Sequence, residues 1–357
     1  MKRIQTAEFL ALRGSMPILD VRSPGEYARA HIPGSISWPL FDDEERAAVG
    51  TAYVREGRSA AVLEGLRRIG PNLAGKTAAI LDMVAAEYDG ERRVALTCWR
   101  GGMRSASMGW LLEQAGFRVR CLQGGYKAYR RHVLAVCAAP YRFFLLGGMT
   151  GSGKTEVLHE LAKLGSQVVD LEGLAAHRGS AFGAVPGLPQ PRTEHFENLL
   201  AGQLAAMDET RPIWLEDESQ NLGQVNIPGP LFTRMRAAPV IRLDVPRPDR
   251  TDRIVRGYDP AHNEFAAEGI NRIQRRLGGE NHKRALEALD AGDYTRVTDI
   301  LLDYYDKAYT KQLAGRPDAV HTHSALPGQS PASCALQLRM WETQEGLQNV
   351  RRGKRQR

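Results

Sequence analysis

Short apolar runs alternate with amphipathic segments along the first part of the chain. Runs at 17–21, 93–98 and 118–122 have the length of buried strands, and residues 105–115 follow a helical pattern that ends at Gly116. Because strands that alternate with helices form parallel sheets, this pattern predicts an α/β domain with a parallel sheet.

A helix start follows the first of these strands. Ser23 has the chemistry of an N-cap, a proline follows at the first helical position, and Glu26 lies three residues after the serine. This is the pattern of a capping box, and it predicts a short helix over residues 27–30. The residues at 31–34 then have turn chemistry that ends the helix.

The alternation starts again after an Ala-Ala-Pro segment at 138–140, which we take as a domain boundary. We therefore expect one domain over 1–137 and a second over 140–357, the latter with a helical extension at 271–312 and a basic tail. The second domain has a predicted helix at 155–164 and predicted strands at 143–146, 167–171, 213–215 and 240–245.

Composition limits the class of protein. The chain has 357 residues, of which 43% are hydrophobic and 25% charged, which is typical of a globular protein. No apolar stretch approaches the length of about 18 residues needed to span a membrane, and the first residues lack a signal-peptide pattern. Since the chain has only 4 Cys, we expect no disulfide framework and a cytoplasmic location.

Net charge favours a polyanionic partner without proving one. The 48 Lys and Arg exceed the 41 Asp and Glu by +7, and residues 1–138 carry 20 basic and 14 acidic side chains, which is most of the excess. Arg, the better bidentate phosphate ligand, dominates the basic residues, although a genome-wide bias toward Arg explains this equally well.

A cysteine loop lies between a predicted strand and a predicted helix. Cys98 is followed by Gly101 and Gly102, which let backbone N–H groups converge, and the next helix points its positive end the same way. Arg100 and Arg104 add positive charge, so a thiolate is favoured at Cys98. Such a loop suits a nucleophile that carries a persulfide, a perselenide or a phosphoryl group, whereas inert core packing is the alternative for a cysteine at a strand end.

The other cysteines lack such a loop. Cys121, Cys137 and Cys334 are therefore expected to be structural. Cys121 is an exception in one respect, since it could approach Cys98 across neighbouring strands.

A phosphate-binding pattern opens the second domain. Residues 148–155 fit G-x-x-x-x-G-K-[ST] between a strand and a helix, the context that this Walker A pattern requires. Backbone N–H groups are expected to surround a pyrophosphate, with Lys154 neutralising its oxygens and Thr155 reaching a Mg²⁺ ion. The phosphate-binding residues are predicted to be Gly148, Thr150, Gly151, Ser152, Gly153, Lys154 and Thr155.

Charged residues follow other strands of the second domain and could support the phosphate site. Three acids end the strand at 213–215, where they serve either as a Mg²⁺ support or as ordinary solvated charges. Further polar residues follow the strand at 167–171, and the carboxyl ends of parallel strands share the edge at which ligands bind. These supporting candidates are Asp170, Arg178, Glu216, Asp217 and Glu218.

Four arginines recur every three residues on a predicted helix. Arg253 and Arg256 each follow an acid by four residues, which favours ion pairs along the helix surface. Arg247 and Arg250 remain candidates to bind phosphates of a nucleotide or of RNA. The arginines at 351–357 could form an RNA arm, although a solvated tail is favoured.

Metal chemistry beyond Mg²⁺ is not expected. A His-x-His pair at 321–323 has no further ligands at metal spacing, so we predict neither zinc nor haem.

Three motifs of the first domain resemble those of rhodanese domains. They lie at 20–34, at the cysteine loop and at 122–129, and together they are specific. The spacing from Cys98 to Arg104 is Cys-x5-Arg, one residue longer than the Cys-x4-Arg of plain sulfurtransferases. The longer loop resembles that of rhodanese-like dual-specificity phosphatases, which implies a roomier site than thiosulfate needs.

The order of the rhodanese-like and P-loop domains resembles the tRNA 2-selenouridine synthase family from residue 1 to at least Arg316. The resemblance implies a transferase that exchanges the sulfur of wobble 2-thiouridine for selenium from selenophosphate. It also implies an S-geranylated intermediate made from geranyl diphosphate. The implied partners are the tRNA anticodon region and an enzyme that supplies selenophosphate; no membrane is involved. Cys98, Arg100, Gly101, Gly102 and Arg104 are the implied catalytic residues.

Other functions remain open from the residues alone. One is an ATP-dependent sulfurtransferase or kinase fusion, in which the phosphate loop hydrolyses a nucleotide. Another is a Cys-x5-Arg phosphatase or a regulatory rhodanese, and a third is an RNA-binding scaffold without activity. Binding of ATP rather than geranyl diphosphate, or phosphate release from aryl phosphates, would separate the first two from the transferase.

Overall fold

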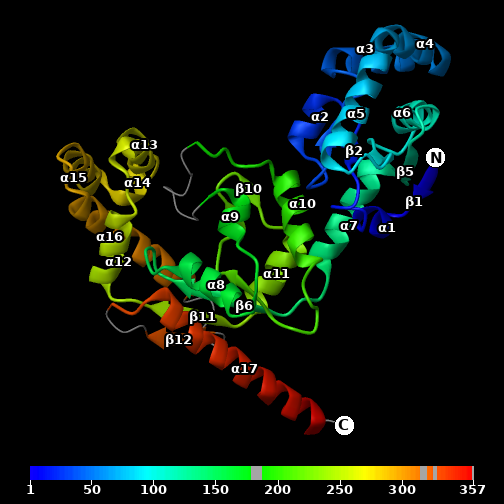
Figure 1. The fold of residues 1–357 in the computed structure, drawn as a ribbon. Coiled ribbons are helices and arrows are strands. Elements are labelled where there is room, and N and C mark those ends of the chain that lie inside the picture. The colour runs from blue at the N-terminus through cyan, green and yellow to red at the C-terminus, as the bar shows by residue number, and fades with distance from the viewer. Residues whose placement is uncertain (178–186, 314–319, 325–327, 356–357) are drawn as a thin grey trace. The chain divides into compact units, whose positions relative to one another are not determined.

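The computed structural model describes residues 1–177, 187–313, 320–324 and 328–355. The chain divides into two compact units, drawn with the rest of the fold in Figure 1. Unit 1 comprises Met1–Val136 and Glu197–Gly202, and unit 2 comprises Cys137–Phe196 and Gln203–Arg357. No helix in the described part of the chain has the length and apolar character needed to cross a membrane.

Unit 1 contains a 5-stranded sheet in the order β1-β5-β4-β2-β3, and all its strand pairs are parallel. The predicted α/β fold with a parallel sheet is thus confirmed here. The strand of the cysteine loop, β4, lies in the middle of the sheet, so that loop begins at a buried position. The strands are β1 (Lys2–Ile4), β2 (Ile18–Asp20), β3 (Ile36–Ser37), β4 (Arg93–Thr97) and β5 (Arg118–Leu122).

The start of the second helix of unit 1 is set by its capping residues. The predicted capping box is present, with Ser23 as N-cap and Glu26 bonded back to it, and the helix therefore begins earlier than predicted, at Pro24. The helices are α1 (Thr6–Leu10), α2 (Pro24–Arg29), α3 (Asp43–Glu56), α4 (Arg58–Ile69), η1 (Gly70–Asn72), α5 (Leu73–Glu87), α6 (Met103–Gln114) and α7 (Gly125–Ala138).

A buried ion pair fixes the chain after β2. The Arg22 guanidinium donates to Asp20 over 2.6 Å and to the carbonyl of Ala30 over 2.8 Å, and both charged side chains are almost fully buried. The same guanidinium lies 3.8 Å from the ring centre of Tyr126. Because every charge has a partner, this cluster holds the loop after β2 in one conformation.

Unit 2 contains a second 5-stranded sheet, in the order β12-β11-β6-β8-β7, again with parallel pairs only. A small antiparallel pair, β9 with β10, lies apart from it. The strands are β6 (Phe143–Gly148), β7 (Gln167–Val168), β8 (Ile213–Glu216), β9 (Asn221–Leu222), β10 (Val225–Asn226), β11 (Val240–Asp244) and β12 (Val320–Ser324).

Two segments of unit 2 differ from prediction. The strand predicted at 167–171 ends at Val168, because Asp170 caps a helix by accepting from the N–H of Gly173. The sequence predicts no strand or helix after the helical extension, but the structure has β12 there and a long helix, α17, that runs to Arg355, so the backbone of 351–355 is helical where a solvated tail is predicted. Apolar side chains of α17, including Leu338, pack with α8 and β6 in one core, which explains why the segment folds.

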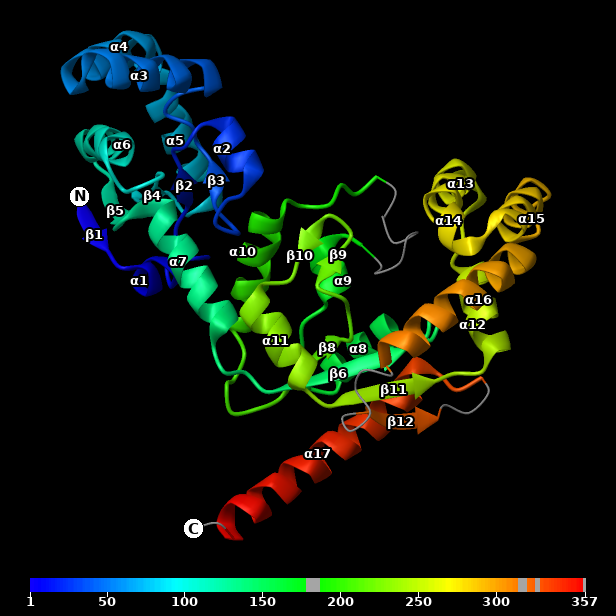
Figure 2. The ribbon, with the colours of Figure 1, turned by 180° about the vertical axis from the view of Figure 1, so that it is seen from behind.

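The remaining helices form the faces and the extension of unit 2, except that residues 197–202 of the helix at 193–204 belong to unit 1. Figure 2 shows α13, α14 and α15 gathered at one end of α16, where they share an apolar core. The helices are α8 (Lys154–Lys163), α9 (Leu171–Ala175), α10 (Thr193–Leu204), α11 (Gly229–Ala237), α12 (Arg247–Arg256), η2 (Pro260–His262), α13 (Asn263–Arg272), α14 (Gln274–Leu277), α15 (Gly279–Asp290), α16 (Tyr294–Leu313) and α17 (Pro331–Arg355).

Candidate functional site

Cys98 lies directly after the carboxyl end of the middle strand of unit 1. Its side chain is buried, and its carbonyl accepts from the N–H of Tyr126 over 2.8 Å. The carbonyl of Trp99 accepts from Lys127 over 3.0 Å, so the loop is tied to the first turn of α7. The first turn of α6 follows at Met103, and its N–H groups have no acceptors within the helix. This arrangement can hold an anion beside the thiol.

The two loop glycines have different roles. Gly101 has φ +64°, and a Cβ there would lie 2.7 Å from the carbonyl oxygen of Leu122, so no other residue fits. Gly102 has negative φ, and a Cβ there would meet no atom of the described residues within 4 Å. Only Gly101 is thus required by its left-handed backbone and close packing, whereas Gly102 has open space around it.

The two loop arginines also differ. Arg104 donates to both carboxylate oxygens of Glu26, over 2.5 and 3.2 Å. Burial opposes both charges, but the mutual hydrogen bonds and attraction outweigh it, so the pKa of Glu26 is lowered and that of Arg104 is raised. Arg100 is exposed and has no ion pair within the described chain. Arg100 is thus the more available of the two for an anionic ligand.

The phosphate loop of unit 2 has the backbone that its glycines predict. Gly148, Gly151 and Gly153 all have positive φ, at +153°, +81° and +79°. A Cβ would lie 2.5 Å from the hydroxyl of Ser152 at the first position and 2.8 Å from Ile254 at the second. The loop is therefore closely packed, and it leads into the N-terminus of α8.

Lys154 and Thr155 begin α8 and point to different partners. The ammonium of Lys154 donates to the carbonyl of Gly148 over 3.2 Å. The hydroxyl of Thr155 donates to Glu172 over 3.2 Å. Glu172, in the first turn of α9, therefore reaches the phosphate loop, at the sheet edge where the sequence places it together with Asp170.

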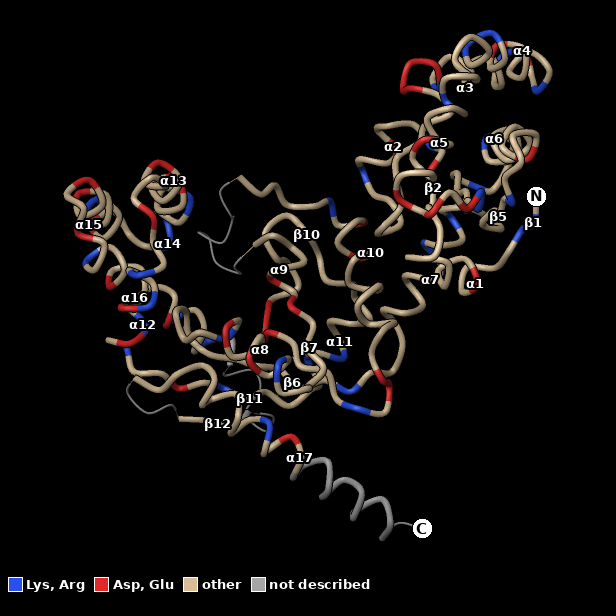
Figure 3. The backbone as a smooth tube through the Cα atoms, viewed as in Figure 1, with Lys and Arg blue, Asp and Glu red and all other residues tan. Residues whose placement is uncertain are grey.

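The predicted acids gather at the same end of the sheet, and Figure 3 shows acidic positions along α9 and beside α8. Glu216 is fully buried and accepts from the N–H of Leu171 over 2.9 Å, and burial raises its pKa well above the ordinary value. Glu218 is partly buried; burial and the nearby charge of Glu172 raise its pKa to about 8. A carboxyl group here is therefore protonated at neutral pH.

Two neighbouring acids have structural contacts. Asp170 caps α9, and its carboxylate accepts from Nε2 of His159 over 2.9 Å when the histidine carries a proton on that nitrogen. Asp217 is buried at the end of β8, and its N–H donates to the carbonyl of Leu146 over 3.0 Å. Both residues thus hold the acidic end of the sheet in place.

Two arginines of α12 hold the phosphate loop by its carbonyl groups. Arg250 is buried, donates to the carbonyl of Thr150 over 3.1 Å and forms a bidentate pair with Asp306 over 2.9 and 2.7 Å. Arg253 donates to the carbonyl of Gly151 over 2.8 Å. The sequence leaves the role of Arg250 open, and the structure makes it a support of the loop.

One of the two ion pairs predicted along α12 is present and the other is not. Arg256 pairs with Asp252 over 2.5 Å as predicted. The pair predicted for Arg253 is wrong, because its expected partner, Asp249, instead accepts from the N–H of Gly328 over 2.8 Å. Arg247 pairs with Asp303 on α16 over 2.6 Å, so its charge is not directed at the phosphate loop.

The described residues contain no group of three or more His, Cys, Asp or Glu side chains that could hold a metal ion. A Mg²⁺ ion bound with a diphosphate needs fewer protein ligands, since phosphate oxygens and water supply the others. Arg178 lies outside the described residues, as do the side chains of 344–357.

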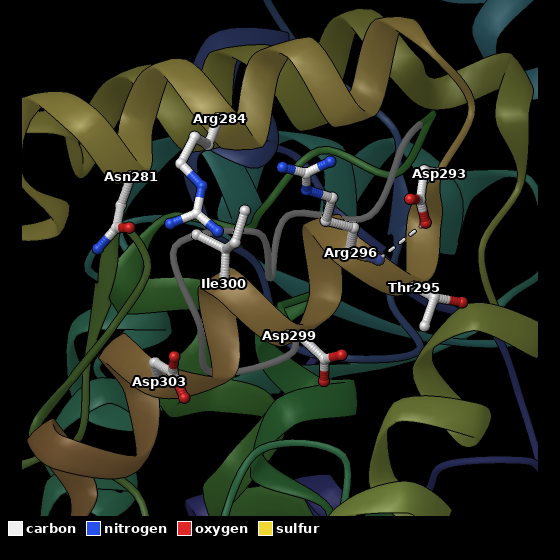
Figure 4. A pocket seen from close by; sticks show the side chains of 8 residues that line it. All are labelled: Asn281, Arg284, Asp293, Thr295, Arg296, Asp299, Ile300 and Asp303. Atoms are coloured by element: carbon white, nitrogen blue, oxygen red, sulfur yellow. Dashed lines mark hydrogen bonds between the residues drawn. The ribbon is translucent and has the colours of Figure 1, made fainter.

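A polar hollow of about 320 Å³ lies between α15 and α16 (Figure 4). Arg284 and Arg296 line it together with three aspartates, and two of these aspartates, Asp299 and Asp303, already pair with Arg247. Because both signs of charge face the hollow and no phosphate-loop residue lines it, we assign it no part in the chemistry.

Comparison with known families agrees with this division of the chain. Residues 5–132 match the model of the "Rhodanese-like domain" family. Residues 141–326 match the model described as "tRNA 2-selenouridine synthase AAA domain". The rhodanese and P-loop parts of the predicted fold are thus confirmed.

Curated proteins resemble the chain over most of its length. A protein from Bordetella bronchiseptica named tRNA 2-selenouridine synthase is 36% identical over 347 residues, which are 87% of this chain and 92% of that protein. One of the same name from Aeromonas salmonicida is 33% identical, with 85% and 89% of the two chains covered. Another from Pseudomonas putida is 34% identical, with 85% and 90% covered.

Proposed function

Since the chain belongs to the tRNA 2-selenouridine synthase family, we propose that it is a transferase that exchanges the sulfur of 2-thiouridine at the tRNA wobble position for selenium. The co-substrates are selenophosphate, delivered by the enzyme that makes it, and geranyl diphosphate. The observation that carries this proposal is the presence, in one chain, of a cysteine loop and a phosphate loop that both have intact anion-binding backbones.

The phosphate loop binds the diphosphate of geranyl diphosphate. The sulfur of the 2-thiouridine attacks C1 of the geranyl group, a C–S bond forms, and the C1–O bond breaks as diphosphate leaves with the electron pair. The base gives up its N3 proton to water, which leaves the S-geranylated base neutral. Negative charge grows on the leaving oxygens, where Lys154 and the N-terminus of α8 stabilise it.

A Mg²⁺ ion fits this step. Thr155 and Glu172 would hold it, because their side chains already meet at the phosphate loop. The fully buried Glu216 has an oxygen, Oε1, with no hydrogen-bond partner among the described residues, which also favours a cation nearby. The ion would neutralise charge on the diphosphate.

The cysteine loop handles selenium. It binds selenophosphate, or the selenium derived from it, between the thiol of Cys98 and the exposed guanidinium of Arg100. At C2 of the geranylated base the C–Se bond forms and the C–S bond breaks, and the sulfur takes up a proton and leaves as geranyl thiol. Water then attacks phosphorus and the P–Se bond breaks, so phosphate leaves and selenium stays on C2. Arg104 holds the loop through Glu26 while this happens.

Two substitutions test the two loops separately. Cys98→Ala and Lys154→Ala proteins are incubated with thiolated tRNA, selenophosphate and geranyl diphosphate, and the nucleosides are measured by mass spectrometry. We expect Cys98→Ala to form geranylated but not selenated base, and Lys154→Ala to form neither. Cys137→Ala and Lys163→Ala, which remove a cysteine and a lysine of unit 2 that lie outside both loops, are the matched controls and should behave like the wild type.

The same assay can reject the proposal. Selenouridine formation by Cys98→Ala at the wild-type rate would remove the thiol from the reaction. Normal geranylation by Lys154→Ala would remove the phosphate loop from it. Turnover of ATP without any binding of geranyl diphosphate would favour an ATP-dependent sulfurtransferase instead.

A further inference from the structure

The cysteine loop of unit 1 presents a large aromatic side chain to solvent. Trp99 directly follows Cys98 and is 38% exposed, whereas Cys98 is only 2% exposed. The ring of Trp99 packs against the ring of Tyr126, with the two centres 5.8 Å apart and the planes tilted by 34°. An exposed indole that rests on another ring can stack against a flat ligand such as a nucleic-acid base.

Tyr126 gives this indole a rigid support. It is fully buried, the guanidinium of Arg22 lies 3.8 Å from its ring centre, and its hydroxyl accepts from the side-chain amide of Asn198, in the same unit, over 2.9 Å. The carbonyl of Trp99 also accepts from the N–H of Lys127 over 3.0 Å, so the backbone is fixed as well. The entropic cost of stacking a ligand on this ring is therefore small.

Unpaired cations accompany the ring. Arg100 lies in the cysteine loop, and Lys127 and Arg131 lie one turn apart on α7; all three are exposed, and none has a hydrogen bond or ion pair with another side chain in the described part of the chain. The neighbouring Arg130 is different, because its charge is neutralised by Glu197. Since Arg100 is already assigned to the selenium-containing anion, Lys127 and Arg131 remain for a second anionic ligand.

The two cations of α7 lie at the end of the helix that contacts the cysteine loop. A Cβ on Gly124 would lie 3.8 Å from Nη2 of Arg131, and a Cβ on the next residue, Gly125, would clash with the carbonyl of Cys98. The guanidinium of Arg131 thus reaches back to the turn that touches the loop. Residues four apart on a helix have Cβ atoms about 5–6 Å apart, so Lys127 and Arg131 can bind neighbouring phosphates of one strand.

An aromatic ring beside phosphate-binding cations is typical of proteins that bind single-stranded nucleic acid. A small anion or an acidic peptide would need the cations but not the exposed indole. Residues 1–138, with 20 basic and 14 acidic side chains, also have the charge that favours a polyanion. The polyanion named by the matching family and by the curated relatives is tRNA.

We propose that Trp99, Lys127 and Arg131 form a docking surface for an unpaired RNA strand, the anticodon loop of tRNA. A base stacks on Trp99, and Lys127 and Arg131 bind the phosphates beside it. This inference rests on the proposed tRNA substrate and names the residues of unit 1 that bind it. Because Trp99 directly follows Cys98, the docked strand passes beside the reactive thiol.

The test is the affinity of the full chain for a fluorescently labelled anticodon stem–loop RNA without sulfur, measured by fluorescence anisotropy at several salt concentrations. We expect Trp99→Ala to weaken binding by about tenfold or more with an unchanged salt dependence, because stacking releases no counterions. Lys127→Ala and Arg131→Ala should each reduce the slope of log affinity against log salt by about 0.7, the value for one phosphate contact on a single strand.

Two exposed residues of unit 1 provide matched controls. Trp110 is 63% exposed in the second half of α6, and Arg118 begins β5, at the opposite edge of the parallel sheet from the cysteine loop. Trp110→Ala and Arg118→Ala should bind RNA as the wild type does. Trp99→Phe keeps an aromatic ring and should retain most of the affinity, whereas Trp99→Leu should bind as weakly as Trp99→Ala.

Wild-type affinity in Trp99→Leu would overturn the stacking role, and unchanged salt slopes in Lys127→Ala and Arg131→Ala would overturn the phosphate contacts. A fully paired RNA of the same length distinguishes an unpaired strand from any polyanion: Trp99→Ala should not weaken its binding, and an equal loss with both RNAs contradicts the proposal. Because this RNA lacks sulfur and no selenophosphate is present, the result is independent of selenouridine formation. Normal RNA binding without selenouridine formation would reject the transferase and leave the docking surface in place.

Discussion

Arg253 donates from Nη1 to the carbonyl oxygen of Gly151 over 2.8 Å, which joins α12 to the phosphate loop. Its guanidinium lies so close to Gly153 that a Cβ there would be 2.8 Å from Arg253 Cζ. Gly153 is the N-cap of α8, the point at which an anion is expected to bind. Arg253 therefore both shapes the loop and adds positive charge to it.

We expect Arg253→Ala to weaken the binding of inorganic pyrophosphate by about tenfold or more, because a charge-assisted hydrogen bond and a nearby cation are lost together. Isothermal titration calorimetry measures the affinity. Arg256→Ala is the matched control, since this exposed arginine of the same helix pairs with Asp252. Equal weakening by both variants would mean that only the net charge of α12 matters.

The buried pair of Arg250 and Asp306 should be important for stability. Its bidentate contacts join α12 to α16, and both side chains are largely buried, at 4% and 19% exposed. Arg250→Met leaves Asp306 without its partner, so we expect the free energy of unfolding to fall by about 3–5 kcal/mol. Urea unfolding followed by circular dichroism measures this loss.

Arg247→Met provides the comparison for that experiment. Arg247 pairs with Asp303 on the same two helices, but the side chains are 40% and 62% exposed. An exposed pair contributes at most about 1 kcal/mol. If Arg247→Met costs as much as Arg250→Met, burial does not explain the difference between the two pairs.

We expect the affinity of the phosphate loop for pyrophosphate to depend on pH because of Glu218. Burial and the charge of Glu172 raise its pKa to about 8, so Glu218 becomes negative only above that pH and then repels a diphosphate. We expect pyrophosphate affinity to fall above about pH 8 in the wild type and not in Glu218→Gln. Glu264→Gln, an exposed residue of α13, removes the same charge elsewhere and should keep the wild-type profile.

The stability of the fold should also depend on the protonation of Glu218. A carboxyl whose folded pKa is raised binds its proton more tightly in the folded state, so it stabilises the fold at low pH. That contribution is lost as pH rises from the ordinary value of 4.5 toward about 8. Across this pH range, the unfolding temperature should decline less for Glu218→Gln than for the wild type. If both proteins decline equally, another group is responsible for the titration.

Features that depend on contiguous residues could be predicted from the sequence. The phosphate loop, the cysteine loop and the capping box of α2 are each set by residues within one short segment, and all have the expected backbone. The parallel sheets also follow, because alternation of strands and helices leaves few topologies.

Features that depend on tertiary partners could not be predicted. Spacing suggests that Arg253 pairs with Asp249, but the carbonyl of Gly151, 102 residues away, provides its acceptor. The sequence places Glu172 at the ligand-binding edge of the sheet, but its hydrogen bond with Thr155 depends on the ends of β7 and β6 being brought together. In the same way, α17 is stabilised by packing with α8 rather than by a strong pattern of its own.

The pair of Glu26 and Arg104, 78 residues apart, joins the capping box of α2 to the cysteine loop. Glu26→Gln removes the charge that holds Arg104 and weakens the cap of α2, so we expect unit 1 to lose about 1–2 kcal/mol of stability at pH 7. Because the pKa of Glu26 is lowered on folding, this contribution exists above the ordinary value of 4.5 and disappears as pH falls below it.

The wild type and Glu26→Gln should therefore differ in urea unfolding at pH 7 and converge in acid. Glu44→Gln, at an exposed position in the first turn of α3, removes one carboxylate without an ion pair to the loop and serves as the control. A difference between wild type and Glu26→Gln that persists at pH 3 would mean that the substitution acts through packing. In that case Arg104 would not depend on Glu26 for its position, and the cysteine loop would have to be held by its contacts with α7 alone.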